Sequence, residues 1–162
     1  MVETLWAPWR MDYILGTGPK FNGCVFCLPE NHLGPLEERL VLHADRDVLV
    51  IMNRYPYNNA HLMVAPRRHV ATLAEAAPGE RAALADMAAR VTEILDKAQR
   101  PDGYNIGINQ GRVAGAGIAD HLHVHVTPRY NGDTNYMTVL GETRVVPEHI
   151  RETYRKLLEF FR

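Results

Sequence analysis

The chain has 162 residues, a formal net charge of −1 and a sequence pI of about 6.7. This length suffices for one domain with a hydrophobic core, so folding requires neither a metal nor a disulfide. Because the charge is close to zero, no broad basic face is expected, which argues against nucleic acid and anionic membranes as partners and favours a small-molecule ligand.

The N-terminal part contains no basic region followed by an apolar run, and no apolar stretch approaches the roughly 20 residues that span a bilayer. We therefore expect a cytoplasmic protein. Cys24 and Cys27 form a C-x-x-C motif. In a reducing compartment this spacing favours a metal site or a redox pair over a structural disulfide.

Short alternating or β-branched runs, bounded by turn-forming residues, predict six strands. They cover residues 40–43, 48–53, 61–65, 103–109, 121–127 and 136–140. Between the third and fourth strands, apolar residues recur at helical spacing, with Pro78 and Glu80 as start signals and Pro101 as a stop signal. This helical stripe consists of Leu84, Met87, Ala88, Val91, Ile94, Leu95 and Ala98.

A second helix is predicted near the C-terminus, beginning at Pro147. Its expected inward-facing residues are Ile150, Tyr154, Leu157, Leu158 and Phe161. Strands joined by short turns, with helices between and after them, predict an α+β fold in which helices cover one face of an antiparallel sheet.

The run 121–126 alternates histidine with branched aliphatic residues, and this period of two is typical of a half-buried strand. His121, His123 and His125 would then share one face, about 6 to 7 Å apart, while Leu122, Val124 and Val126 pack into the core. A neutral imidazole is a nucleophile at physiological pH and could attack phosphorus. A metal-binding tripod or an ordinary histidine-rich face would give the same pattern.

A loop rich in small residues, 111–119, leads into this histidine run. Successive backbone N–H groups in such a loop could bind an anion such as a phosphate, although an ordinary tight turn has a similar composition.

The alternating histidines, the following Thr127, Pro128 and Arg129, the preceding small-residue loop and the segment 59–66 resemble the histidine triad (HIT) superfamily of nucleotidyl hydrolases and transferases. The resemblance covers residues from about 24 to 130. The segments 5–10 and 132–136 resemble more narrowly its diadenosine tetraphosphate phosphorylase branch.

This resemblance implies an antiparallel sheet of about five strands with helices packed on it, plus a C-terminal helix. It also implies a single domain over 1–162, made of an irregular segment 1–30, a core 31–130 and an extension 131–162. Family members are commonly homodimers, and a homodimer is expected here.

By resemblance, His123 is the nucleophile, and His125 contacts the phosphate and its bridging oxygen. His61 matches the fourth family histidine beside the nucleophile, although the residue alone is equally compatible with a core histidine. Asn53 matches a ribose-binding position, and either Gln110 or its neighbour Asn109 matches a position that binds ribose or phosphate. Asparagine side chains at such places also commonly bond their own backbone.

The phosphate-binding loop would comprise Ala116, Gly117, Ile118 and Ala119. Many family hydrolases carry Gln followed by Ser or Thr where this chain has Gly117 and Ile118. The absence of those side chains leaves room for inorganic phosphate, rather than water, as the acceptor.

In zinc-carrying family members, the C-x-x-C pairs with the histidine that ends a Pro-x-x-His turn and with the first triad histidine. The corresponding ligands are Cys24, Cys27, His69 and His121, and such a closed set would hold a structural zinc. A redox dithiol is the alternative for the two cysteines.

The expected function is cleavage of a dinucleoside polyphosphate, such as diadenosine tetraphosphate, at the α-phosphorus through a nucleotidyl-histidine intermediate. Phosphate or water would then release the nucleotide, and no organic cofactor is expected. Alternatives are a nucleoside phosphoramidate or adenylyl-sulfate hydrolase, a nucleotide-binding protein with incidental turnover, and a hydrolase that uses the three histidines as a catalytic metal tripod.

Overall fold

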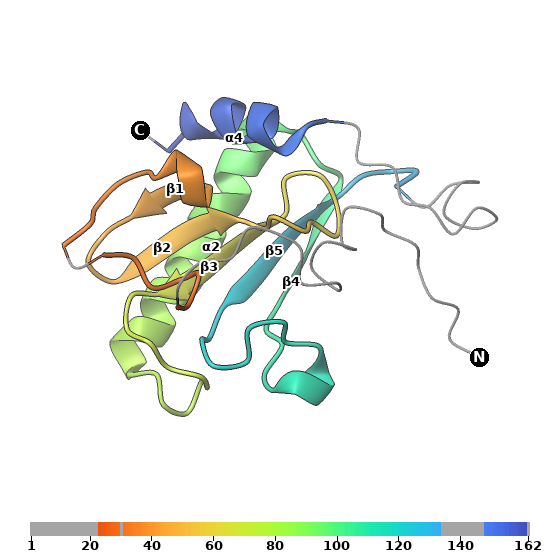
Figure 1. Cartoon of the computed structure of the whole chain (residues 1–162). Helices are drawn as coiled ribbons and strands as arrows, with labels where there is room; N and C mark the ends of the chain where they lie inside the picture. The colour runs from red at the N-terminus through yellow and green to blue at the C-terminus, as the bar shows by residue number, and fades with distance from the viewer. Residues whose placement is uncertain (1–22, 30, 134–147, 162) are drawn as a thin grey trace.

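A computed structural model describes residues 23–29, 31–133 and 148–161 (Figure 1). The strands are β1 Val41–Ala44, β2 Val48–Met52, β3 Leu62–Pro66, β4 Gly103–Gly107 and β5 Val124–Arg129. The helices are α2 Pro78–Ala98 and α4 Ile150–Leu158, with short 3-10 helices η1 Glu37–Arg39 and η2 Arg112–Ala114.

The strands form one antiparallel sheet in the order β1-β2-β3-β5-β4. The α+β class and the sheet of five strands are therefore confirmed. The predicted strand 136–140 lies outside the described residues. Every residue of β2 and β3 is buried, so the centre of the sheet is covered on both of its faces.

The histidine strand begins later than predicted, at Val124 instead of His121. The reason lies in the hydrogen bonds of the preceding residues. Leu122 N–H donates to the Val70 carbonyl at 2.6 Å, and the ring of His121 donates to the Pro66 carbonyl at 2.9 Å. The chain before Val124 thus bonds to Pro66, the last residue of β3, and to Val70 in the segment that follows. Leu122, Val124 and Val126 are buried as expected.

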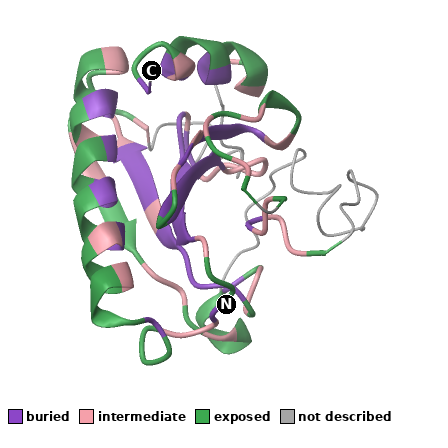
Figure 2. Cartoon of the chain, turned by 90° about the vertical axis from the view of Figure 1, so that its left-hand side faces the viewer, coloured by how far each residue is buried: buried purple, intermediate pink, exposed green. Residues whose placement is uncertain are grey.

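Helix α2 begins at Pro78, as the start signals predicted. The Glu80 carboxylate accepts a hydrogen bond from the Ala77 N–H at 2.7 Å, which satisfies a donor that the helix leaves unpaired. Its buried residues are Leu84, Met87, Ala88, Val91, Ile94 and Leu95. They confirm the predicted stripe except at Ala98, which is partly buried. Figure 2 shows this buried side facing the sheet while the opposite side is exposed.

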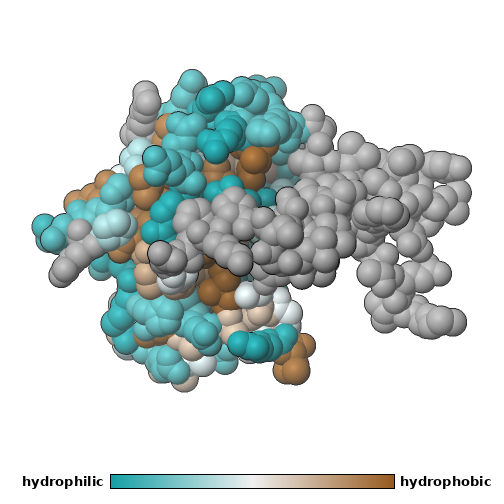
Figure 3. All heavy atoms as spheres, in the orientation of Figure 1, coloured by the Kyte–Doolittle hydropathy of each residue, from teal (hydrophilic) through white to brown (hydrophobic). Residues whose placement is uncertain are grey.

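Helix α4 crosses near the end of α2 that is close to β1 (Figure 1). It begins at Ile150, with the His149 ring accepting the Arg151 N–H at 3.3 Å, whereas the predicted start, Pro147, lies outside the described residues. Tyr154 is buried, and its hydroxyl donates to the Val41 carbonyl at 2.9 Å. Hydrophilic residues cover much of the outer surface over α4 (Figure 3). The hydrogen bond from Tyr154 attaches α4 to β1.

Among the described residues, no helix combines the length and the apolar character that crossing a membrane requires.

Candidate functional site

Three imidazoles meet where β3 and β5 run side by side. His61 directly precedes β3, His125 lies in β5 opposite Met63, and His123 comes just before β5. The ring centroids of His61 and His125 are 5.1 Å apart, and those of His123 and His125 are 4.8 Å apart. The structure thus brings together the three histidines that the sequence predicted as catalytic.

The hydrogen bonds of these rings assign their tautomers. The Tyr57 N–H, which is always a donor, points at Nδ1 of His61 at 3.2 Å, so this nitrogen carries a lone pair. The proton of a neutral His61 then sits on Nε2 and is donated to Nδ1 of His125 at 2.9 Å. It follows that a neutral His125 carries its own proton on Nε2, where it is available to another partner.

His123 has the complementary arrangement. Its Nδ1 lies 2.8 Å from the backbone carbonyl of His121, which is always an acceptor, so Nδ1 carries the proton. The lone pair of a neutral His123 therefore lies on Nε2. The site presents one nucleophilic nitrogen and, on the neighbouring ring, one hydrogen-bond donor.

Burial keeps both rings neutral. His123 is 3% exposed, and this burial lowers its pKa below the ordinary value of 6.5. Burial likewise lowers the pKa of His125 to about 4, and the neighbouring His123 adds to the shift. Near neutral pH the neutral forms of these two rings therefore predominate.

Two aromatic residues that the sequence reasoning missed border the imidazoles. Phe26 is fully buried, and its ring centroid lies 4.8 Å from that of His123. The Tyr57 ring stacks on His61 at 4.8 Å. In the sequence, the available signals were the place of Phe26 inside the C-x-x-C motif and the place of Tyr57 four residues before His61.

Four metal-ligand side chains converge beside this cluster: Cys24, Cys27, His69 and His121, whose donor atoms all lie within 4.8 Å of one another. Cys24 Sγ is 3.4 Å from His121 Nδ1, and Cys27 Sγ is 3.2 Å from His69 Nδ1 and 3.7 Å from His121 Nδ1. A tetrahedral zinc with ordinary bond lengths separates its nitrogen and sulfur ligands by about 3.5 Å. The donor set therefore fits a zinc ion.

The surroundings of these four side chains, which we call the metal group, support the fit. Nε2 of His121 donates to the Pro66 carbonyl at 2.9 Å, which leaves Nδ1 as the lone pair that faces the cysteines. Such a hydrogen bond from the far nitrogen is usual for metal-binding histidines. Both cysteines are free thiols.

Arg39, at the end of η1, braces the cysteine turn from its backbone side. Its guanidinium donates to the carbonyls of Cys24, Val25 and Cys27 at 3.0, 2.8 and 2.9 Å. These bonds satisfy three backbone acceptors of one turn with a single rigid side chain. Sequence reasoning did not identify this residue.

Two of the three predicted nucleotide-binding amides, Asn53 and Gln110, form hydrogen bonds within the protein. Asn53 Nδ2 lies 3.2 Å from Nδ1 of His61, and its Oδ1 accepts the Tyr55 N–H at 2.9 Å. Gln110 Oε1 accepts the Leu73 N–H at 3.0 Å. Asn109 lies beneath the small-residue loop, with its Nδ2 3.7 Å from the point where a Cβ on Gly115 would stand. Of these three amides, Asn53 is the one that lies within hydrogen-bond distance of His61.

The small-residue loop folds around η2. Gly111 and Gly115 both have a φ of 88°, a conformation that favours glycine. The Ala116 N–H bonds to the Gly111 carbonyl at 3.3 Å, so this predicted phosphate donor is occupied within the loop. Gly117 is exposed, and Ile118 and Ala119 are partly buried.

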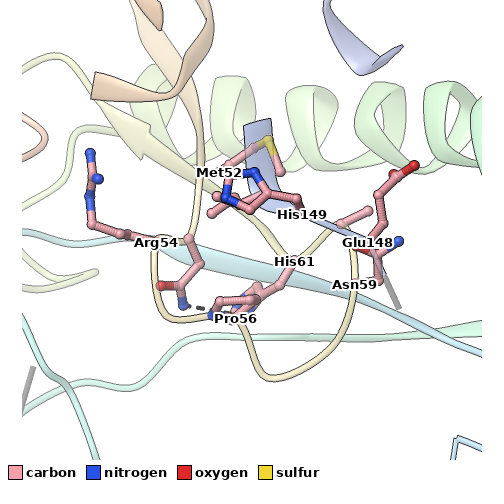
Figure 4. A pocket seen from close by; sticks show the side chains of 10 residues that line it. Met52, Arg54, Pro56, Asn59, His61, Glu148 and His149 are labelled. Carbon is pink, nitrogen blue, oxygen red and sulfur yellow. Dashed lines mark hydrogen bonds between the residues drawn. The ribbon is translucent and has the colours of Figure 1, made fainter. Parts of the chain in front are cut away.

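A pocket of about 470 Å³ opens between the loop that follows β2 and the start of α4 (Figure 4). Its lining comprises Met52, Asn53, Arg54, Pro56, Asn59, Ala60, His61, Glu148, His149 and Ile150. Two of the predicted site residues, Asn53 and His61, thus border a space large enough for part of a small-molecule ligand.

Comparisons with known proteins agree with the predicted resemblance. A model of the HIT domain family matches residues 36–132, more than half of the chain. The chain is 36% identical over 96% of its length to the protein named AP-4-A phosphorylase of Mycobacterium tuberculosis, of which the match covers 83%. It is also 36% identical to an uncharacterised HIT-like protein of Methanocaldococcus jannaschii, over 68% of this chain and 81% of that protein.

A solved structure shares the fold. The crystal structure of a zinc-bound histidine triad family protein from Mycobacterium smegmatis matches with a TM-score of 0.63 and 28% identity, covering 75% of this chain and 83% of that one. With its sheet and its histidine cluster, the chain therefore belongs to the HIT family and stands among its nucleotidyl hydrolases and transferases.

Proposed function

We propose that the protein cleaves dinucleoside polyphosphates of the diadenosine tetraphosphate type, with His123 as the nucleophile. The observation that carries this proposal is the hydrogen bond from His123 Nδ1 to the His121 carbonyl, which leaves Nε2 as the lone pair beside the Nε2–H of His125. The name of the relative that matches nearly the whole chain, AP-4-A phosphorylase, supports the choice of substrate.

In the first step, Nε2 of His123 attacks the α-phosphorus and the bond to the bridging oxygen breaks. The electron pair of that bond leaves with the polyphosphate, and the Nε2–H of His125 stabilises the developing charge by a hydrogen bond. The His123 ring becomes positively charged, and its Nδ1–H bonded to the His121 carbonyl stabilises this charge. The product is a nucleotide bound covalently to His123.

In the second step, an acceptor oxygen attacks the same phosphorus, and the electron pair of the nitrogen–phosphorus bond returns to His123. We propose inorganic phosphate as this acceptor. Gly117 and Ile118 provide no polar side chain that would orient a water molecule. Asn53, Gln110 or Asn109, and backbone N–H groups of Gly117, Ile118 and Ala119 are the proposed contacts for the ribose and phosphates.

Zinc is proposed to be held by Cys24, Cys27, His69 and His121 in a structural role. With four protein ligands, the ion would have no open position for substrate, so it would supply rigidity to the site and not a reactive water. Free thiols at such a site also suit the proposed cytoplasmic location.

The nucleophile is tested by His123→Asn. We expect turnover of diadenosine tetraphosphate to fall by more than about 1000-fold, because the amide removes the attacking nitrogen, with nucleotide affinity largely unchanged. Rates are measured by chromatography of products, and affinity by calorimetry with AMP. His43→Asn, which replaces an imidazole outside the cluster, is the matched control. Full activity in the His123 variant would refute the assignment.

The acceptor is tested by incubating the protein with diadenosine tetraphosphate, with and without inorganic phosphate. A phosphorylase produces ADP and ATP only when phosphate is present, because phosphate takes the enzyme-bound AMP. Formation of AMP and ATP at the same rate in both incubations would identify water as the acceptor and contradict this part of the proposal.

Removal of the metal tests the zinc site. We expect elemental analysis to find one zinc per chain, and chelation to lower the Tm by at least about 5 °C, since roughly 1 to 2 kcal/mol gives that shift in a domain of this size. Cys24→Ser should lose the zinc, whereas His43→Asn should keep it. Purified protein that contains no zinc and does not bind added Zn²⁺ would rule out the four-ligand set.

We also propose that two copies of the chain associate through β4. This strand ends the sheet, no described element pairs with its outer edge, and Ile106 in it is 52% exposed. Exposed edges of this kind favour pairing with a second chain, and a two-fold axis would let β4 pair with its copy.

Sedimentation of the wild-type protein should therefore show a dimer. Ile106→Lys is expected to shift it to a monomer, because a lysine on an edge strand opposes strand pairing. Leu33→Lys, at another exposed apolar residue, is the control and should remain dimeric. A wild-type monomer at micromolar concentration would be incompatible with this interface.

A further inference from the structure

The turn that carries the two cysteines also carries an aromatic ring that packs on His123. Phe26, the residue before Cys27, has no exposed surface. Its ring centroid lies 4.8 Å from that of His123 with an angle of 31° between the planes, and 5.2 Å from that of His121 at 55°. The Phe26 ring is thus tilted against the His123 ring and lies closer to parallel with it than with the His121 ring.

The position of Phe26 is fixed from two sides of its turn. The Cys27 N–H bonds to the Cys24 carbonyl at 3.2 Å, and Arg39 donates to three carbonyls of the same turn. On the other side, both thiols point at the histidines of the metal group. Phe26 lies between Cys24 and Cys27 in sequence, so its backbone belongs to the same turn as both thiols.

The His123 ring needs this contact to be held in one orientation. Its Nδ1 bond to the His121 carbonyl fixes one atom of the ring. The second side-chain torsion of histidine has a broad energy profile, so one hydrogen bond restricts it incompletely. Packing must supply the remaining restraint. Phe26 meets the His123 ring at 31° and 4.8 Å, whereas His125 meets it edge-on at 71°.

We propose that Phe26 is a positioning residue for His123 and that it transmits the state of the cysteine turn to the nucleophile. This inference rests on the proposed function of His123. When the thiols are held by a metal ion, Phe26 covers one face of the imidazole and keeps Nε2 directed at the phosphorus. When the metal is lost, the turn relaxes, Phe26 withdraws, and the reaction slows although nucleotide binding persists.

The kinetic test compares Phe26→Leu and Phe26→Ala with Val25→Ala. For Phe26→Ala we expect kcat to fall by about 10- to 100-fold with KM within about twofold, because a displacement near 1 Å of a reacting group costs up to about 100-fold in rate. Phe26→Leu, which retains most of the apolar volume, should lie between this variant and the wild type. Val25→Ala alters the neighbouring turn residue and should behave like the wild type.

Zinc content is measured for each variant, because it distinguishes a misoriented His123 from a cysteine turn that is no longer folded. Retained zinc with a reduced kcat supports the proposal. A wild-type kcat in both Phe26 variants would overturn it, as would a fall in kcat that only follows a loss of zinc. Should Phe26→Ala fail to fold, Phe26→Leu alone decides between these outcomes.

A spectroscopic test needs no substrate and remains valid even if the proposed reaction is wrong. The ring protons of His123 are observed by NMR in histidine-labelled protein, before chelation, after it, and after Zn²⁺ is added back. We expect chelation to shift these signals in the same direction as Phe26→Leu, because both remove the aromatic face, and Zn²⁺ to restore them. Signals of His123 that do not respond to chelation would refute the coupling, whereas absent turnover with responsive signals would refute only the proposed function.

Discussion

The site depends on one constraint, which is that backbone groups have fixed hydrogen-bonding roles. A backbone N–H only donates and a carbonyl only accepts, so the Tyr57 N–H and the His121 carbonyl determine the tautomer of every ring between them. The first sets His61 and, through it, His125, while the second sets His123. Burial then lowers the pKa of His123 below its ordinary value and that of His125 to about 4, which keeps these two rings neutral. The nucleophilic nitrogen and the neighbouring donor thus follow from main-chain geometry.

The same constraint explains why three alternating histidines serve two different sites. In an unbroken strand their side chains would form one row. The sheet pairing begins only at Val124, and the preceding residues bond to the end of β3 and to the segment after it. The His121 ring therefore turns its Nδ1 toward the cysteines, while His123 and His125 remain with His61. The metal group and the imidazole cluster are neighbours because one short run of chain supplies both.

The spacing of apolar residues along the sequence predicted the helices and strands whose formation depends on neighbouring residues. The helical stripe from Leu84 to Leu95 and the period-two run at His121 gave a helix and a strand that the structure contains. The family resemblance indicated which distant side chains converge. Neither source revealed Phe26 or Arg39 as neighbours of the site, because their contacts join residues far apart in sequence or lie on backbone carbonyls. The hydrogen-bond partners of Asn53 and Gln110 could not be predicted either, because they depend on loop conformations that sequence periodicity does not encode.

The acceptor for His123 Nδ1 belongs to the main chain, so any residue at position 121 would still supply it. Side-chain evolution at this position can therefore eliminate the ligand nitrogen without erasing the tautomer preference of its neighbour. The tautomer of His123 thus depends on a main-chain partner that point mutation does not remove, whereas the group of Cys24, Cys27, His69 and His121 depends on side chains that point mutation can remove.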